Sequence, residues 1–312
     1  MEARFIRAVL VAALLPVALG AGYQTPNFII QTADPRLAEQ FAKTAEKSRH
    51  ELAVAWLGQP MPEWWQPCVV TAQVGPNLGA GAATSFLFDR GEVYGWRMNV
   101  QGSAERIQDS VLPHEITHMI FASHFRAPVP RWADEGGATS VEHPSEQAKH
   151  KQMLVQFLRT GRGIAFNEMF AMTEYPQDVM PLYAQAHALA DYLIQRGGRR
   201  KFVAYVAEGM KTQRWGEATR RHYGLADLGA LQNHWVAWVG QGCPRLAPRD
   251  DRPGSPAEPD RLLAAGSRLP RPEPNLIFRI PRSDPAGAVR TQLTRPQPFE
   301  QSRQVVLEWN RP

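Results

Sequence analysis

Hydrophobic and polar residues alternate in short runs in the first third of the chain and follow a helical period afterwards. The alternating or apolar runs predict β-strands at 27–31, 68–74, 84–87 and 93–100. A helix interrupts them, with Asp34 before a proline at its first position and Gly58 at its end. From Ser103 to about residue 243 the spacing is helical. Strands followed by helices predict an α+β domain, with a small N-terminal mixed or antiparallel sheet and then a mainly helical half.

The first twenty residues have the pattern of a signal peptide. Arg4 and Arg7 precede an apolar run, 8–19, that is too short to span a bilayer comfortably, and Gly20 ends a small-residue cleavage site. We therefore expect residues 1–20 to be removed and the protein to be exported to the periplasm or beyond the cell. An uncleaved N-terminal anchor is the alternative. No other transmembrane span is expected.

Composition changes at residue 244. Residues 244–312 contain 13 of the 26 prolines, and their 12 arginines against 8 acidic residues account for +4 of the formal net charge of +5. Such a segment buries little apolar surface, so we expect a disordered tail, with 305–310 as a candidate for an added strand. Its charge does not indicate nucleic acid, because no aromatic residues are interleaved with the basic ones. A solvated tail without a partner is the favoured interpretation, and weak contact with an anionic envelope surface is the alternative. Residues 21–243 are the right size for one domain.

Cys68 and Cys243 are the two cysteines of the chain. In an exported protein such a pair predicts a disulfide, here one that joins an early strand to the end of the folded part. Two separate thiols are the alternative. Two cysteines cannot form a thiolate cage for zinc.

The candidate chemistry lies in the run His114-Glu115-Ile116-Thr117-His118. Two histidines four apart on a helix lie on one face, so both imidazoles can reach a single zinc ion. The glutamate beside the first histidine can then take a proton from a metal-activated water. By chance alone this motif arises in about one per cent of chains with this many histidines, so the surrounding residues matter.

Pro113 stands directly before the motif. Inside a helix, proline removes one hydrogen bond and bends the chain. Either the metal helix starts near Leu112, or a helix that begins at Ala104 bends there.

A catalytic zinc site needs a third protein ligand, and the sequence offers two candidates. Glu135 lies 17 residues after His118, a gap that allows one helix to end and a second to bring a carboxylate beside the histidines. The other reading of Glu135 is an acid that complements a helix dipole. His124 matches the spacing HExxHxxGxxH, but Phe121 stands where that pattern has glycine. On a continuous helix His124 would point about 80° from His114 and lie about 15 Å along the axis, so Glu135 is favoured.

These motifs resemble those of the gluzincin zinc metallopeptidases, the clan of thermolysin and the aminopeptidases, and most closely the peptidase MA-like domains of exported bacterial proteins. The resemblance covers about residues 100–240, through HEITH, PRWADEGG and the runs 182–186 and 192–198. It implies a zincin-like fold, a Zn²⁺ ion bound by His114, His118 and Glu135, and Glu115 as the general base in peptide-bond hydrolysis.

The resemblance also implies a tyrosine or histidine that donates to the oxyanion. Tyr183 matches best, with His187 as the second candidate, and a plain core aromatic is the alternative for Tyr183. Thermolysin-like enzymes have a carboxylate four residues after the ligand glutamate, where this chain has Thr139. The outer partners of the two histidines are therefore not assigned by the sequence.

The expected partner is a peptide or protein substrate. The strand at 84–87, beside the glycine-containing loop 76–81, is expected to be an edge strand that pairs with an extended substrate. The competing class is a catalytically inactive peptidase-like domain that serves for binding or as a scaffold in the cell envelope. A zinc enzyme that acts on another bond is a third reading, because the motif defines how water is activated and not which bond is cleaved.

Overall fold

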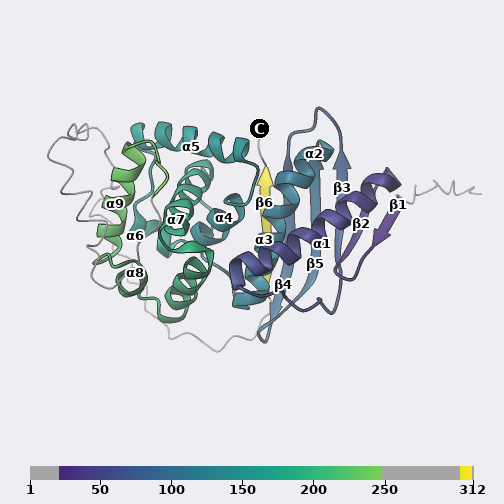
Figure 1. Ribbon diagram of the computed structural model, residues 1–312, viewed down its shortest axis with the longest axis horizontal. Helices are drawn as coiled ribbons and strands as arrows, with labels where there is room; N and C mark the ends of the chain where they lie inside the picture. Colours follow the sequence, from purple (N-terminus) through teal and green to yellow (C-terminus); the bar gives the residue numbers. More distant parts are fainter. Residues whose placement is uncertain (1–20, 247–302, 311–312) are drawn as a thin grey trace, which may run out of the picture.

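The computed structural model describes residues 21–246 and 303–310, so the predicted signal peptide lies outside the described residues. The described chain has the predicted α+β class, with a mixed sheet beside a helical half (Figure 1). The strands are β1 (Ala21–Gln24), β2 (Phe28–Thr32), β3 (Cys68–Val74), β4 (Gly81–Asp89), β5 (Glu92–Gly102) and β6 (Arg303–Asn310). The helices are α1 (Pro35–Leu57), α2 (Ala104–Arg106), the π-helical turn η1 (Ile107–Val111), α3 (Leu112–Phe125), α4 (Arg131–Thr139), α5 (Pro144–Arg159), α6 (Phe166–Ala171), α7 (Met180–Thr212), α8 (Trp215–Tyr223) and α9 (Leu228–Gly240).

The strand order in the sheet is β1-β2-β3-β5-β4-β6. The pairs β2–β3 and β3–β5 are parallel, and the other three pairs are antiparallel. Between β2 and β3 the chain crosses over through α1. The Asp34 side chain accepts from the backbone N–H of Arg36 at 2.8 Å and so caps that helix. Gly58 ends it with a left-handed φ of 84°, which glycine adopts without steric cost.

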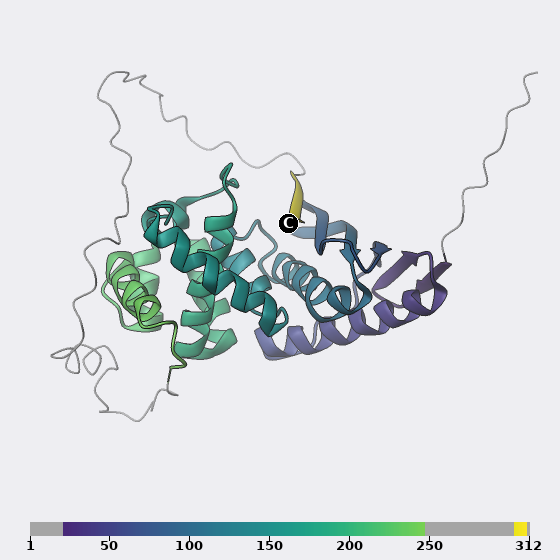
Figure 2. The same cartoon turned by 90° about the horizontal axis from the view of Figure 1, so that it is seen from above.

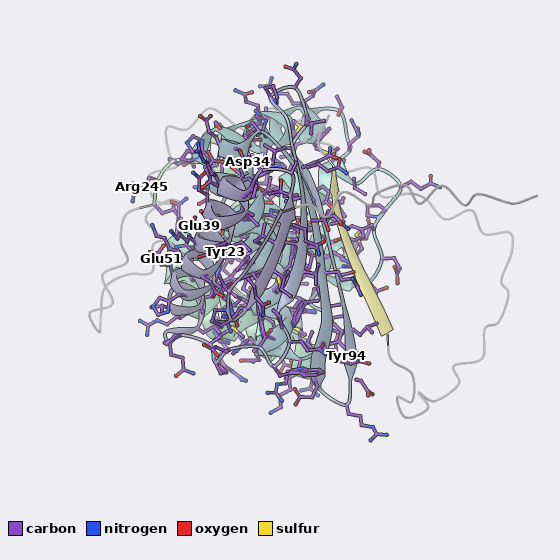
Figure 3. All side chains as sticks on the ribbon, turned by 90° about the vertical axis from the view of Figure 1, so that its right-hand side faces the viewer. Tyr23, Asp34, Glu39, Glu51, Tyr94 and Arg245 are labelled. Carbon is purple, nitrogen blue, oxygen red and sulfur yellow. The ribbon has the colours of Figure 1, made fainter. Side chains whose placement is uncertain are left out.

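Helices α1 and α3 pack against one face of the sheet, and α4 to α9 form the helical half (Figures 1 and 2). Figure 3 shows α1, with Glu39 and Glu51 labelled, on one side of the strands, and β6 along the edge of the sheet. The buried faces of the strands and of α1 form one continuous core, to which Phe28, Ile30 and Phe41 belong. Among the described residues, no helix combines the length and the apolar character that crossing a bilayer requires.

Cys68 and Cys243 are both free thiols, so the predicted disulfide is wrong. The physical reason is topological. Cys68 begins β3 in the sheet, whereas Cys243 follows α9, and these two elements lie at opposite ends of the molecule (Figure 1). Burial raises the pKa of the Cys68 thiol, which therefore stays protonated.

The closing segment of the chain joins the sheet. Residues 303–310 form β6, which runs antiparallel to β4 with Thr84 opposite Leu307. The added strand predicted at 305–310 is therefore confirmed, and the disordered tail predicted over 244–312 is wrong for 303–310. Residues 247–302 and 311–312 lie outside the described part. The prediction that 84–87 is an edge strand is also wrong, because β4 pairs with β5 on one side and with β6 on the other.

Candidate metal centre

The HExxH motif lies on α3 and is buried. The helical turns that begin at Ala104 lead into α3 through the π-helical turn η1, where the Leu112 N–H donates to the carbonyl of Ile107. Pro113 is the second residue of α3 and follows the π-helical turn directly, so its missing N–H falls where the helical hydrogen-bond pattern changes. Both sequence readings hold in part, since α3 starts at Leu112 and helical structure precedes it. Single π-helical turns are frequent at functional sites.

The two histidines and Glu135 come together in one buried group, which we call the metal cluster. His114 Nε2 and His118 Nε2 are 3.1 Å apart, and they lie 3.7 and 3.8 Å from Glu135 Oε2. All three residues are at most 2% exposed. Such separations suit atoms that each lie about 2.0–2.2 Å from one shared ion. The predicted ligand set is therefore assembled as a group that can bind a metal.

Two glycines allow α4 to bring Glu135 to this point. A Cβ on Gly136 would lie 2.4 Å from the carbonyl oxygen of Ala186 on α7, and a Cβ on Gly137 would lie 2.4 Å from the ring of Phe121 on α3. Side chains at either position would push α4 away from the helices on both sides of it. Phe121 replaces the glycine of the HExxHxxGxxH pattern, and here it packs against Gly137.

Two carboxylates hold the histidine rings from behind. His114 Nδ1 lies 2.8 Å from Glu142 Oε1, and His118 Nδ1 lies 2.7 Å from Asp134 Oδ1. A carboxylate accepts a proton, so both rings carry hydrogen on Nδ1 and turn Nε2 toward the cluster. Sequence reasoning did not assign these partners. The position where thermolysin-like enzymes have a carboxylate is Thr139, and residues 134 and 142 supply the carboxylates instead.

Removing either supporting carboxylate is expected to weaken metal binding without removing a ligand. We expect Glu142→Gln and Asp134→Asn each to lower zinc affinity about 10- to 100-fold, the usual range for such outer partners. Competition against a chromophoric chelator measures this effect. Gln152→Glu, an amide-to-carboxylate exchange at an exposed position of α5, serves as the control. Wild-type affinity in both amide variants would show that the carboxylates do not orient the rings.

Glu135 is itself fixed by a tyrosine from the loop between α6 and α7. The Tyr175 hydroxyl donates to Glu135 Oε1 at 2.5 Å, and the Arg131 guanidinium carbon lies 4.3 Å from the centre of the Tyr175 ring. Tyr183 on α7 hydrogen-bonds to Tyr175. Burial, with Glu135 as the next cause, raises the pKa of both tyrosines, so both hydroxyls keep their protons and can donate. Tyr175 had no distinguishing signal in the sequence.

Glu115 lies beside the cluster and is held by the sheet. The Thr84 hydroxyl of β4 donates to Glu115 Oε2, which leaves Oε1 available to another partner. Burial raises the pKa of Glu115 to about 7, although His118 and Thr84 oppose that rise. Thr84 was predicted only as part of a strand, and its contact with Glu115 follows from the packing of α3 on β4.

The donor set fits a divalent cation. Glu135 Oε2 is buried and has no hydrogen-bond partner among the described residues, and it faces the Nε2 atoms of His114 and His118. Burial lowers the pKa of His118, but Asp134 and Glu135 outweigh burial and raise it to about 10. The carboxylates thus create a field that favours positive charge at this place. Two imidazoles and one carboxylate form a ligand set that zinc commonly takes.

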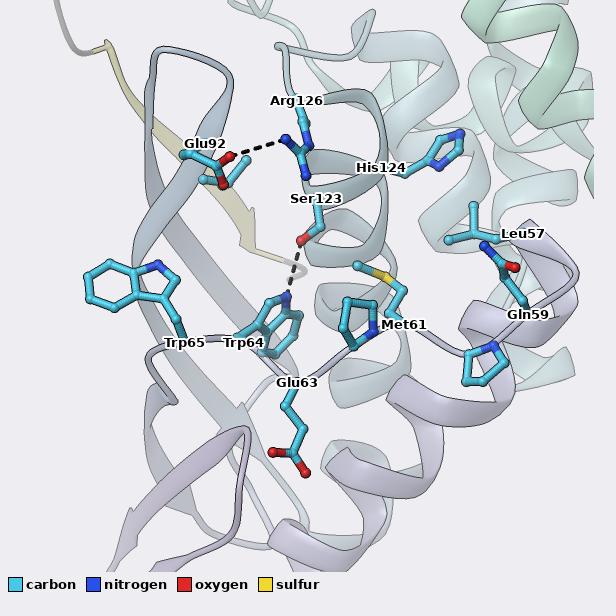
Figure 4. Close-up of a pocket in the computed structure, with 13 residues that line it drawn as sticks. Leu57, Gln59, Met61, Glu63, Trp64, Trp65, Glu92, Ser123, His124 and Arg126 are labelled. Atoms are coloured by element: carbon cyan, nitrogen blue, oxygen red, sulfur yellow. Dashed lines mark hydrogen bonds and ion pairs between the residues drawn. The ribbon is translucent and has the colours of Figure 1, made fainter.

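His124 and His187 do not join the metal cluster. His124 is exposed near the end of α3 and lines a pocket of about 450 Å³ with Met61 and Trp64 (Figure 4). That position is six residues beyond His118, about 9 Å along the helix axis. His187, the second candidate for an oxyanion donor, is buried on α7 with its ring centre 5.8 Å from that of His150.

A scan against protein-family models, a search of curated proteins and a search of solved structures each found no match. The class of this protein is therefore defined by its fold and its site alone. The protein is an α+β protein with a buried His-His-Glu group that can bind a metal ion.

Proposed function

We propose that this protein is an exported zinc metallopeptidase of the gluzincin type, with a zincin-like fold. It would hydrolyse a peptide bond in a peptide or protein substrate by means of a metal-activated water, with Glu115 as general base. The observation that supports this proposal best is the convergence of His114, His118 and Glu135 within 4.8 Å, with Glu115 directly beside the first histidine.

Each residue of the site has a separate proposed role that follows from its position. His114 Nε2, His118 Nε2 and Glu135 Oε2 would bind the zinc. The ion would supply Lewis acidity and a lowered pKa for a water at its open position. Glu115 would accept a proton from that water and pass it to the leaving amine. The Tyr183 hydroxyl is the proposed donor to the developing oxyanion, in the role that the resemblance implies.

The alternative is a catalytically inactive peptidase-like domain that binds or scaffolds in the envelope. It would keep the same fold, with or without a bound metal. Turnover therefore distinguishes the two functions.

Metal removal tests both functions. We expect about one zinc per chain by mass spectrometry of metals, a lower melting temperature after chelation because the ion binds only the folded state, and recovery when zinc is returned. Hydrolysis of an unfolded protein substrate should disappear and return with the metal. Magnesium, which prefers oxygen ligands and octahedral geometry, is the matched control and should restore nothing. Zinc without turnover, or no zinc even after reconstitution, would contradict the hydrolytic function and support the inactive binding or scaffold domain.

A further inference from the structure

The strand next to the proposed base has no free edge. Thr84 of β4 holds Glu115 through its hydroxyl. On its outer side, β4 is paired along its length by β6, from Gly81 opposite Asn310 to Phe88 opposite Arg303. The terminal segment of the chain therefore runs beside the proposed catalytic base, antiparallel to β4.

An added strand is the way an extended peptide would reach this site. Main-chain hydrogen bonds to an exposed sheet edge are a general mode of peptide binding. Of the two strands against which α3 packs, β5 lies inside the sheet between β3 and β4. Among the described strands, the outer side of β4 is therefore where a peptide could pair close to Glu115, and β6 occupies it.

The site is closed in this arrangement. Glu115 and the three residues of the metal cluster are each at most 2% exposed. In Figures 1 and 2, β6 lies at the edge of the sheet that faces the helical half, where α4 brings Glu135. A pocket near His118, lined also by Phe86 and Asp134, has a volume of only about 10 Å³, which is room for about one water.

We propose that residues 303–310 occupy the strand position of the substrate and hold the protein in a closed, inactive state. An extended polypeptide segment displaces β6, pairs with β4 in the same antiparallel direction and so reaches Glu115. This inference rests on the proposed function. The sequence of β6 contains the strand-forming residues Val305, Val306 and Trp309, so the expected substrate is an unfolded, extended segment with an apolar centre. A strand on the same chain has a high effective concentration, so it competes well against a dilute peptide.

The test uses the full chain. Val306→Pro fixes φ at about −65° in the middle of β6, where an antiparallel strand has φ of about −140°, and so weakens its pairing with β4. Val306→Thr keeps the strand preference and is the matched control. Three readings are taken on each variant. They are amide hydrogen exchange over 81–89, binding of a fluorescent peptide with the sequence of residues 303–310 to chains that also have Glu115→Gln, and hydrolysis of an unfolded protein substrate by the chains with intact Glu115.

We expect Val306→Pro to raise exchange at the outer amides of β4 at least tenfold, to bind the peptide at least tenfold more tightly than wild type, and to hydrolyse substrate at least tenfold faster. Val306→Thr should match wild type in all three readings. Equal exchange and equal peptide binding in the two variants would overturn the inference. So would release of a dimer into monomers by Val306→Pro, since the strand would then come from a second copy. Gain of peptide binding with no hydrolysis in any variant would keep β6 as the occupant of a peptide-binding edge and overturn the proposed hydrolytic function.

Discussion

Glu115→Gln is expected to lower the hydrolytic rate about a thousandfold or more while the zinc content stays at the wild-type level. The glutamine amide cannot accept a proton, and a positioned general base contributes about 10²- to 10⁴-fold. The three residues of the metal cluster do not change, so the metal should remain. Loss of turnover without loss of metal separates the role of base from that of ligand.

The fold should survive this change. Glutamine has the shape of glutamate, and its carbonyl oxygen can still accept from the Thr84 hydroxyl. Because Glu115 is buried at 1% exposure, replacing a carboxyl group by a neutral amide also removes the cost of burying a charge. The measurement is the rate on an unfolded protein substrate, in the wild-type chain and with Val306→Pro, so that pairing of β6 does not mask the difference. Glu146→Gln, a change to a buried glutamate outside the metal cluster, is the control. Activity within tenfold of wild type would remove Glu115 as the base.

Glu135→Ala is expected to weaken zinc binding by more than the 10- to 100-fold expected of the supporting carboxylates. The variant leaves two histidines where a protein zinc site normally has three ligands or more. His124→Ala is the matched control. It removes an exposed histidine six residues after His118 and should bind zinc like wild type. Chelator competition and zinc content measure both variants.

The result also separates ligand loss from unfolding. Glu135→Ala also leaves the Tyr175 hydroxyl without its acceptor, so its metal-free melting temperature should lie below that of wild type. The rise in melting temperature when zinc is added, measured for each variant against its own metal-free form, should be large in wild type and small in Glu135→Ala. Retention of zinc by Glu135→Ala, together with its loss in His124→Ala, would place the third ligand on α3 and contradict the proposed site.

The local features of this chain were readable from its sequence because they depend on neighbours a few residues apart. Histidines four apart lie on one helical face whatever surrounds them, which made His114 and His118 a pair. Asp34 and Gly58 marked the ends of α1 because capping uses groups within one turn. The order of strands and helices predicted the α+β class. Glu135 was favoured as the third partner because a gap of 17 residues lets a second helix return.

Only the tertiary structure determined the contacts between segments that lie far apart in the chain. Glu142 and Asp134 reach the backs of the histidine rings because α4 and the turn after it pack against α3, and no local pattern encodes that packing. Tyr175 comes from a loop, where sequence spacing predicts little. The partner of a strand edge is also decided by topology, so sequence alone predicted a free edge where β4 pairs with β6. The disulfide prediction failed for the same reason, since chain topology sets the distance between two cysteines and composition does not.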